Sequence, residues 1–157
     1  MAIYRSPEEF RKSNPWDRIV ATSGGFDPMH VGHLRCLQES AMVAGQLDCQ
    51  LVVIVNADSF LERKKGRPFM PEAERCEIIA GVRGVDHVVL FESSGQTVDL
   101  ALEVLRPIVF TKGGDRDSHD NIPETGTCDA IGCRILTGVG GGKVQSSSWL
   151  IDNARSA

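Results

Sequence analysis

Two closely spaced histidines, His30 and His33, are the residues of this 157-residue sequence whose types and spacing best suit chemistry. An imidazole can donate an N–H to phosphate oxygens on which negative charge develops in a transition state. Gly32 lies between the two histidines, and glycine lets the backbone approach a ligand closely because no Cβ intervenes. We predict that residues 23–34 hold a nucleoside triphosphate while it is attacked. The other nucleotide contacts predicted in this stretch are Gly24, Gly25 and Phe26.

The elements around this stretch place it where ligands bind in parallel sheets. Residues 19–22 suit a buried strand, and Leu34, Leu37 and Ala41 then recur on one face of a helix. A strand-to-helix crossing lies at the carboxyl end of its strand, beside helical N–H groups that favour phosphate. Glycines after a strand are often only a turn, and a lone histidine is often structural. The dense clustering of these residues favours a binding site.

A basic run, residues 63–67, follows the next predicted strand, residues 50–56. A solvated surface loop is the alternative interpretation. However, the carboxyl ends of parallel strands share one rim, so a lysine there can reach a triphosphate. We therefore predict a catalytic role for Lys64 or Lys65. Arg75 either orients this loop, pairs with Glu72 or binds substrate. The predicted contacts to the second substrate are Asp27, Asn56, Arg67 and Arg75.

Two later segments at the same rim also suit anions. A glycine turn follows the strand predicted at residues 107–111, and Asp115 in that turn can accept from a ribose hydroxyl. A run of serines opens the last helix, where hydroxyls and free N–H groups form an anion site. A plain turn and ordinary N-caps are the structural alternatives. The nucleotide contacts predicted here are Lys112, Gly113, Asp115, Ser146, Ser147 and Ser148.

Strands and helices alternate along the whole chain. Apolar runs predict further strands at residues 86–91 and 133–137, with helical periodicity between them. This alternation builds βαβ units, so we expect a single α/β domain over residues 1–157 with a Rossmann-like, doubly wound, five-stranded parallel sheet. Residues 1–16 are expected to form a helical extension that begins after Ser6 and serves packing or a subunit contact.

Composition narrows the classes of partner. The net charge of −4 argues against a nucleic-acid partner. The sequence lacks the long apolar run of a membrane helix and the core of a signal peptide, so we expect a cytoplasmic protein without a membrane partner. Five cysteines without a C-x-x-C pair suit reduced thiols rather than disulfides or zinc. We predict no metal ligands from the protein.

The motif resembles the signature of a known enzyme family. Residues 25–33, Gly-Phe-Asp-Pro-Met-His-Val-Gly-His, are similar to the signature of nucleotidyltransferases that carry an H-x-G-H motif. Residues 56–58, 67–75, 85–89 and 112–115 look like the adenylyltransferases that make ADP-heptose from a heptose 1-phosphate. The same framework is similar to the glycerol-3-phosphate cytidylyltransferases.

This resemblance implies transfer of a nucleotidyl group from ATP or CTP to a phosphorylated small molecule. It implies that His30 and His33 bind the phosphates, that Lys64 or Lys65 bridges them, and that the serines at 146–148 hold the triphosphate with Mg²⁺. The favoured function is adenylyl transfer to a heptose 1-phosphate-like acceptor. Cytidylyl transfer to glycerol 3-phosphate or a related alcohol phosphate is the alternative. Two other classes are a non-catalytic nucleotide-binding regulator and a fragment-like relative of class I aminoacyl-tRNA synthetases, which share the H-x-G-H idea.

The reaction expected from these parts is a direct displacement. The acceptor phosphate attacks the α-phosphorus in line and pyrophosphate leaves, so no residue needs to act as a nucleophile. Positioning and stabilisation of charge would supply the catalysis. The expected partners are the triphosphate and the acceptor, and a homodimer is one option for the assembly.

Overall fold

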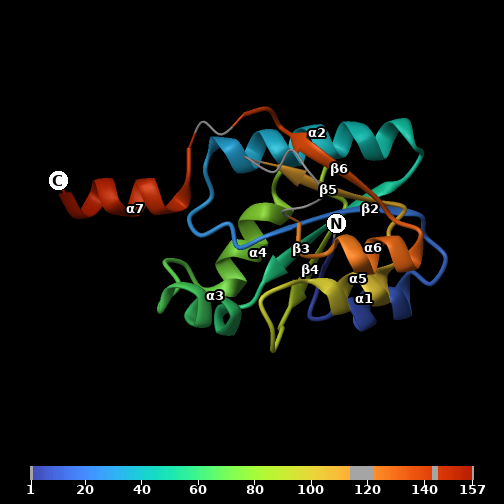
Figure 1. Ribbon diagram of the computed structural model, residues 1–157, viewed down its shortest axis with the longest axis horizontal. Coiled ribbons are helices and arrows are strands. Elements are labelled where there is room, and N and C mark those ends of the chain that lie inside the picture. Colours follow the sequence, from blue (N-terminus) through green and yellow to red (C-terminus); the bar gives the residue numbers. More distant parts are fainter. Residues whose placement is uncertain (1, 114–121, 143–144, 157) are drawn as a thin grey trace.

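The computed structural model describes residues 2–113, 122–142 and 145–156 (Figure 1). The strands are β1 (Ala2–Tyr4), β2 (Ile19–Gly24), β3 (Gln50–Asn56), β4 (His87–Phe91), β5 (Val109–Gly113) and β6 (Arg134–Val139). The helices are α1 (Pro7–Ser13), α2 (Val31–Gln46), α3 (Asp58–Lys65), α4 (Glu72–Ala80), α5 (Asp99–Leu105), α6 (Thr125–Ile131) and α7 (Ser147–Ser156). The predicted alternation of strands and helices is confirmed.

The six strands form one parallel sheet in the order β1-β4-β3-β2-β5-β6. The parallel α/β prediction is confirmed, but the count of five strands was wrong because β1 was missed. Three residues are too few to show a strand pattern, and pairing with β4 fixes this edge strand, with Ile3 opposite Val88. The segment expected to be only helical therefore begins with a strand. Its helix then starts as predicted, with the Ser6 side chain accepting from the Glu9 N–H.

Helices cover both faces of the sheet, as a doubly wound fold requires (Figure 1). On one face α1, α5 and α6 bury Phe10, Leu102 and Cys128 against the strands. On the other face α2 and α4 bury Leu37 and Ile79. The apolar run of β3 suits this arrangement, because a central parallel strand is covered from both sides.

The strand order reverses beside β2, with β3 on one side of it and β5 on the other. Such a switch point opens a crevice at the carboxyl ends of the strands, where ligands bind in open α/β sheets. The histidine motif leaves β2 at this point and enters α2. The fold therefore presents the motif at the crevice.

Two predicted loop segments belong instead to regular elements. Residues 62–65 form the last turn of α3, because Phe60 and Leu61 are buried on that helix. Lys112 and Gly113 end β5, where Gly113 pairs with Val139 of β6. Lys64, Lys112 and Gly113 nevertheless stay at the predicted rim.

The last helix, α7, extends away from the body of the domain (Figure 1) and buries none of its residues. In the parts of the chain that the structure describes, no helix has both the length and the apolar character needed to span a membrane.

Candidate active site

A cleft of about 470 Å³ opens at the switch point, and we refer to it as the first cleft. This volume suits a small-molecule site. The predicted residues that line it are Gly24, Phe26, His30, His33, Lys64, Lys112, Gly113, Ser146 and Ser147. Ser23, the first residue of the predicted stretch 23–34, lines it too. Further lining residues for which no role was predicted are Thr22, Cys36, Gly140, Gly141, Gly142 and Gln145.

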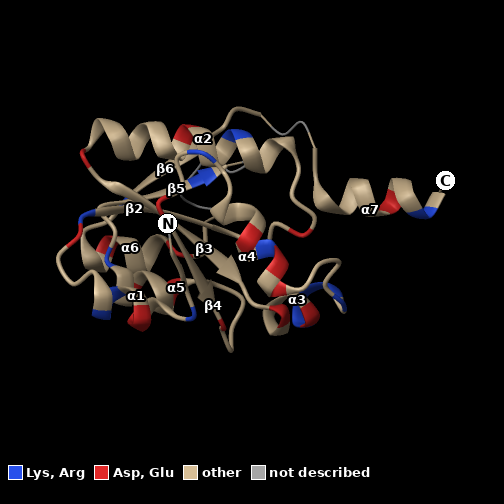
Figure 2. Cartoon of the chain, turned by 180° about the vertical axis from the view of Figure 1, so that it is seen from behind, with Lys and Arg blue, Asp and Glu red and all other residues tan. Residues whose placement is uncertain are grey.

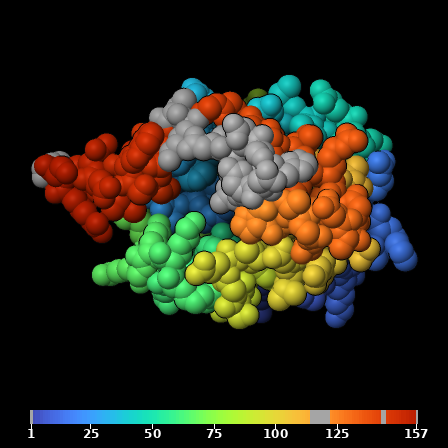
Figure 3. Space-filling model, viewed as in Figure 1, coloured from blue at the N-terminus to red at the C-terminus, as the bar shows by residue number. Residues whose placement is uncertain are grey.

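A second cleft of about 500 Å³ adjoins the first, and α3 and α7 form opposite parts of its lining. The space-filling view shows a hollow between the red α7 and the green α3 (Figure 3). The predicted residues that line it are Gly25, Phe26, Asp27, His33, Asn56, Lys64, Lys65, Arg67, Ser147 and Ser148. Phe26, His33, Lys64 and Ser147 line both clefts, so the clefts meet at these side chains.

The two histidines form the start of α2. Nδ1 of His30 accepts from the N–H groups of Gly32 (3.1 Å) and His33 (3.4 Å), and Nδ1 of His33 accepts from the His30 N–H (3.2 Å). The two rings stack with their centroids 3.8 Å apart. Because each Nδ1 is an acceptor, each neutral ring carries its proton on Nε2. Capping of the helix thus fixes the tautomer of both side chains.

Burial and the neighbouring His30 lower the pKa of His33 to about 4. His33 is therefore neutral at physiological pH, and it donates as a dipole rather than as a cation. The ring of Phe26 meets it edge-on, with centroids 5.1 Å apart and planes at 64°. Phe26 is nearly fully buried, so this contact holds the His33 ring in place.

The glycine segment before α7 approaches α2 closely. A Cβ at Gly140, whose φ is +89°, would lie 2.7 Å from the Cys36 backbone nitrogen, and a Cβ at Gly113 would lie 2.8 Å from the Val139 carbonyl oxygen. The Gly140 N–H also donates to the Glu39 carboxylate. Only glycine permits this approach. Residues 138–142, four of which are glycine, were the sequence signal for these lining residues, but their contact with α2 is visible only in the tertiary structure.

The last turn of α3 is basic, as its blue colour shows (Figure 2), and its two lysines have different contacts. Nζ of Lys65 lies 2.7 Å from the Asp27 carboxylate and donates to the Asp27 carbonyl oxygen at 2.7 Å. Lys64 lines both clefts, and it forms no ion pair with any described residue. The geometry therefore favours Lys64 as the lysine that meets a ligand.

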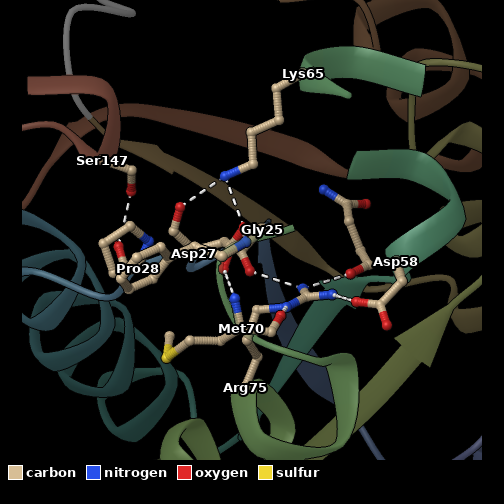
Figure 4. Close-up of polar contacts among 10 residues, drawn as sticks. Gly25, Asp27, Pro28, Asp58, Lys65, Met70, Arg75 and Ser147 are labelled. Atoms are coloured by element: carbon tan, nitrogen blue, oxygen red, sulfur yellow. Dashed lines mark hydrogen bonds and ion pairs between the residues drawn. The ribbon is translucent and has the colours of Figure 1, made fainter. Parts of the chain in front are cut away.

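Asp27 is 2% exposed and is surrounded by donors (Figure 4). Besides Lys65, the backbone N–H groups of Phe69 (2.7 Å) and Met70 (2.6 Å) donate to its carboxylate. Burial raises the pKa of Asp27, but these hydrogen bonds outweigh it, and the pKa lies below its usual value. The carboxylate thus fastens residues 66–71 to the motif, and the contact of Asp27 with substrate stays a prediction.

Asp27→Asn is expected to destabilise the protein by about 1 to 3 kcal/mol, because the amide loses the Lys65 pair and turns a donor toward a backbone N–H. A carboxylate with a lowered pKa stabilises the fold at neutral pH, and this contribution is lost as the pH falls through that pKa. The difference in unfolding free energy between wild type and variant should therefore shrink below about pH 4. Urea unfolding at several pH values measures it, with exposed Asp129→Asn as the control. An equal difference at every pH would contradict this account.

Arg75 is fully buried and belongs to the described lining of neither cleft, so its predicted contact with substrate stays a prediction. Its guanidinium donates to the carbonyl oxygens of Met70, Gly25 and Asn56 and pairs with the Asp58 carboxylate at 2.7 Å (Figure 4). Glu72, the alternative partner, accepts instead from the Asp58 N–H. Arg75 thus ties the motif to the end of β3.

Lys112 lines the first cleft at the end of β5. Its Nζ lies 3.6 Å from a Glu124 carboxylate oxygen and 4.9 Å from the centroid of the Phe110 ring. Asp115, the other polar residue predicted in that turn, lies outside the described residues.

The three serines have different contacts. Ser146 caps α7, because its Oγ accepts from the Trp149 N–H at 3.1 Å. Ser147 Oγ donates to the Pro28 carbonyl oxygen at 2.7 Å, and Ser148 Oγ lies 3.2 Å from Ser146 Oγ. Ser147 thus joins α7 to the motif at the place where the clefts meet.

Replacing Ser147 by alanine is expected to raise the nucleotide KM about tenfold or more. Its hydroxyl donates to the Pro28 carbonyl oxygen in this structure and would turn to donate to a phosphate oxygen in the complex, so the variant loses that bond to a charged ligand. Ser147→Asp should raise it further, since a carboxylate would repel the phosphates. The cap is Ser146, so Ser146→Asp should keep the stability of wild type. Steady-state kinetics and thermal unfolding of the three variants test this, with Ser156→Ala on the same helix as the control. An active Ser147→Asp variant with normal KM would place the triphosphate elsewhere.

The described residues contain no group of three or more His, Cys, Asp or Glu side chains placed to hold a metal ion. No carboxylate belongs to the described lining of the first cleft.

Comparisons with known proteins agree on one family. The model of the cytidylyltransferase-like family matches residues 21–125. Over 141 residues the chain is 33% identical to the bifunctional protein HldE of a Nitratiruptor species. The matched stretch covers 88% of this chain and 28% of that protein. Over 100 residues it is 45% identical to HldE of Geotalea uraniireducens, and that stretch covers 62% of this chain and 19% of that protein. The chain thus spans between about a fifth and just over a quarter of these relatives.

Solved structures agree with the fold. The lipopolysaccharide core biosynthesis protein from Thermoplasma volcanium GSS1 has a TM-score of 0.63 at 26% identity, over 78% of this chain and 96% of that chain. The macrolide-efflux protein from Streptococcus pneumoniae has a TM-score of 0.60 at 16% identity, over 94% of this chain and 53% of that chain. The second similarity concerns the fold alone.

Proposed function

The chain belongs to the cytidylyltransferase-like family of nucleotidyltransferases, and we propose that it transfers an adenylyl group from ATP to the phosphate of a heptose 1-phosphate-like sugar. The observation that carries this proposal is the meeting of two clefts at His33, Lys64 and Ser147. One cleft would hold the nucleotide and the other the acceptor. The resemblance of the sequence to heptose 1-phosphate adenylyltransferases supports the choice of acceptor, as does the likeness to a lipopolysaccharide core biosynthesis protein.

The reaction would proceed by a single displacement. An acceptor phosphate oxygen forms a bond to the α-phosphorus. At the same time the bond between the α-phosphorus and the oxygen that bridges it to the β-phosphorus breaks, and pyrophosphate leaves with the electron pair of that bond. The Nε2–H groups of His30 and His33 would donate to the α-phosphoryl oxygens, where preorganised donors act most strongly. Lys64 would neutralise charge on the phosphates from the other side. Positioning of both substrates supplies the remaining rate enhancement.

Mg²⁺ would enter as part of the nucleotide substrate. Magnesium keeps several waters and binds phosphate oxygens readily, so it needs few protein carboxylates. Chelation by EDTA is therefore expected to abolish turnover and to leave the melting temperature of the nucleotide-free protein unchanged. A melting temperature that drops on chelation would indicate a resident metal and would contradict this assignment.

The proposal is tested by incubating the protein with each of the four triphosphates, Mg²⁺ and a panel of heptose 1-phosphates, hexose 1-phosphates and glycerol 3-phosphate. Pyrophosphate release and mass spectrometry detect the two products. We expect pyrophosphate and an ADP-sugar only when ATP and a sugar 1-phosphate are both present. Products from CTP and glycerol 3-phosphate would instead establish the cytidylyl alternative. Nucleotide binding without any pyrophosphate would favour a regulator and overturn the proposal.

A further inference from the structure

Asn56 carries a buried polar atom without a partner at the second cleft. It ends β3, is 8% exposed and lines that cleft, and its Oδ1 makes no hydrogen bond with the described residues. Its backbone is held in place, because Arg75 donates to its carbonyl oxygen at 2.6 Å. A buried polar atom without a partner costs stability and is rare in native proteins. We therefore expect a donor group of a ligand to form a hydrogen bond with Oδ1.

The chemistry of an amide specifies the group that would satisfy it. A side-chain amide has both an acceptor and donors, and a hydroxyl can likewise donate and accept. A hydroxyl can pair with both halves of the Asn56 amide. An apolar substituent would leave Oδ1 unsatisfied, and an ammonium group, which only donates, would leave the amide N–H groups without an acceptor. The second cleft is suited at this point to a ligand that carries hydroxyl groups.

The C-terminal helix supplies the facing wall. Ser148, Asp152 and Arg155 follow one another at helical spacing on the side of α7 that borders the second cleft. Because α7 buries none of its residues, packing in the core does not account for these side chains. Asp152 adds a carboxylate that accepts hydroxyl hydrogens, which is a second group suited to the same ligand.

The remaining charges of the cleft favour an anion. Lys65 is paired with Asp27, but Lys64, Arg67 and Arg155 form no ion pair with any described residue. Asp152 is the other carboxylate of the described lining. Three cations thus face one carboxylate, and this balance suits a phosphate or similar anionic group.

We propose that Asn56 and Asp152 determine acceptor specificity by binding hydroxyl groups, so that the second cleft selects a phosphate that carries several hydroxyls. This inference rests on the proposed function, because it assigns the second cleft to the acceptor. Asn56 would bind acceptor hydroxyls from the end of β3, and Asp152 would bind them from α7. The acceptor class is therefore a sugar or polyol phosphate rather than a phosphate with a cationic or mainly apolar substituent.

Asn56→Leu is the most informative variant, since leucine has a similar volume and no polar atom. We expect it to raise the Kd and KM of a sugar 1-phosphate about tenfold or more, the loss of one hydrogen bond in a buried site. The nucleotide KM should stay unchanged, and the melting temperature should stay the same or rise because the unsatisfied amide is gone. Asp152→Ala should weaken the acceptor in the same way, and Asp152→Asn, which keeps an acceptor oxygen, should weaken it less. Asn153→Ala on the same helix is the control.

Deoxy analogues of the acceptor identify the hydroxyl concerned. Removing the hydroxyl that Asn56 binds should weaken the wild type and have no further effect on Asn56→Leu. Additive effects for every deoxy analogue, or a normal acceptor Kd in Asn56→Leu, would overturn the inference.

Calorimetry with hexose and heptose 1-phosphates, in the presence of a non-hydrolysable ATP analogue, separates this inference from the proposed function. Binding that depends on Asn56 without turnover would support the inference and count against the transfer reaction. Turnover with an unchanged acceptor KM in Asn56→Leu would support the transfer reaction and overturn the inference. Failure of every sugar phosphate to bind would overturn the inference as well.

Discussion

His33→Ala is expected to lower kcat about 10²- to 10³-fold and to change the nucleotide Kd little, because a donor aimed at a transition state acts mainly on the rate. His33 lies where the two clefts meet, and its proton is on Nε2 because its Nδ1 accepts from the His30 N–H. Single-turnover kinetics and nucleotide binding measure the two effects separately. A variant with near-normal kcat would remove His33 from the reaction.

His30 requires a different substitution because it also caps α2. His30→Ala removes both the cap and the donor, whereas His30→Asn keeps a capping side chain and loses the imidazole N–H. Both variants should lose kcat to a similar extent, and only His30→Ala should lose stability. His87→Ala is the control, since His87 lies on β4 and bonds Gln50 away from the clefts. Its kcat should equal that of wild type.

The lowered pKa of His33 predicts how kcat and stability depend on pH. Because the folded-state pKa is about 4, His33 stays neutral and kcat should not fall with a midpoint near the ordinary histidine pKa of about 6.5. The unfolded chain takes up this proton first, so His33 costs stability progressively as the pH falls from about 6.5 to about 4. The stability of wild type relative to His33→Ala should decline across that window. A midpoint of kcat near 6.5 that disappears in His33→Ala would contradict the assignment.

Lys64→Ala is expected to lower kcat about 100-fold, since it removes a cation from the junction of the clefts. Lys64 lines both clefts, and no described residue forms an ion pair with it. Lys65→Ala should act mainly on stability, because it leaves the buried Asp27 carboxylate without its partner. Steady-state kinetics and thermal unfolding of both variants separate the two roles, with Lys12→Ala on α1 as the control. Wild-type kcat in both variants would indicate that residues 63–67 form only a solvated surface.

The parts of this protein that the sequence predicted are those encoded by neighbouring residues. The apolar run of β3 and the helical periodicity after His33 each repeat within a few positions, so the parallel α/β fold could be predicted from them. The glycines and histidines of the motif lie within ten positions of one another, and they fold together at one strand-to-helix crossing. By contrast, β1 gives almost no local signal, because only its pairing with β4 makes it a strand.

The roles of individual polar residues depend on partners far away in the chain. Asp27 meets Lys65 across 38 positions, and Arg75 meets Gly25 across 50. A sequence pattern shows that such residues carry charge, but not whether a partner has already neutralised it. The structure shows which charges have partners. Asp27 pairs with Lys65 and Arg75 pairs with Asp58, whereas Lys64 lines the clefts without an ion pair to any described residue. The second cleft likewise exists only in the tertiary structure, because α7 and the end of β3 are brought together by the fold and not by their spacing in the sequence.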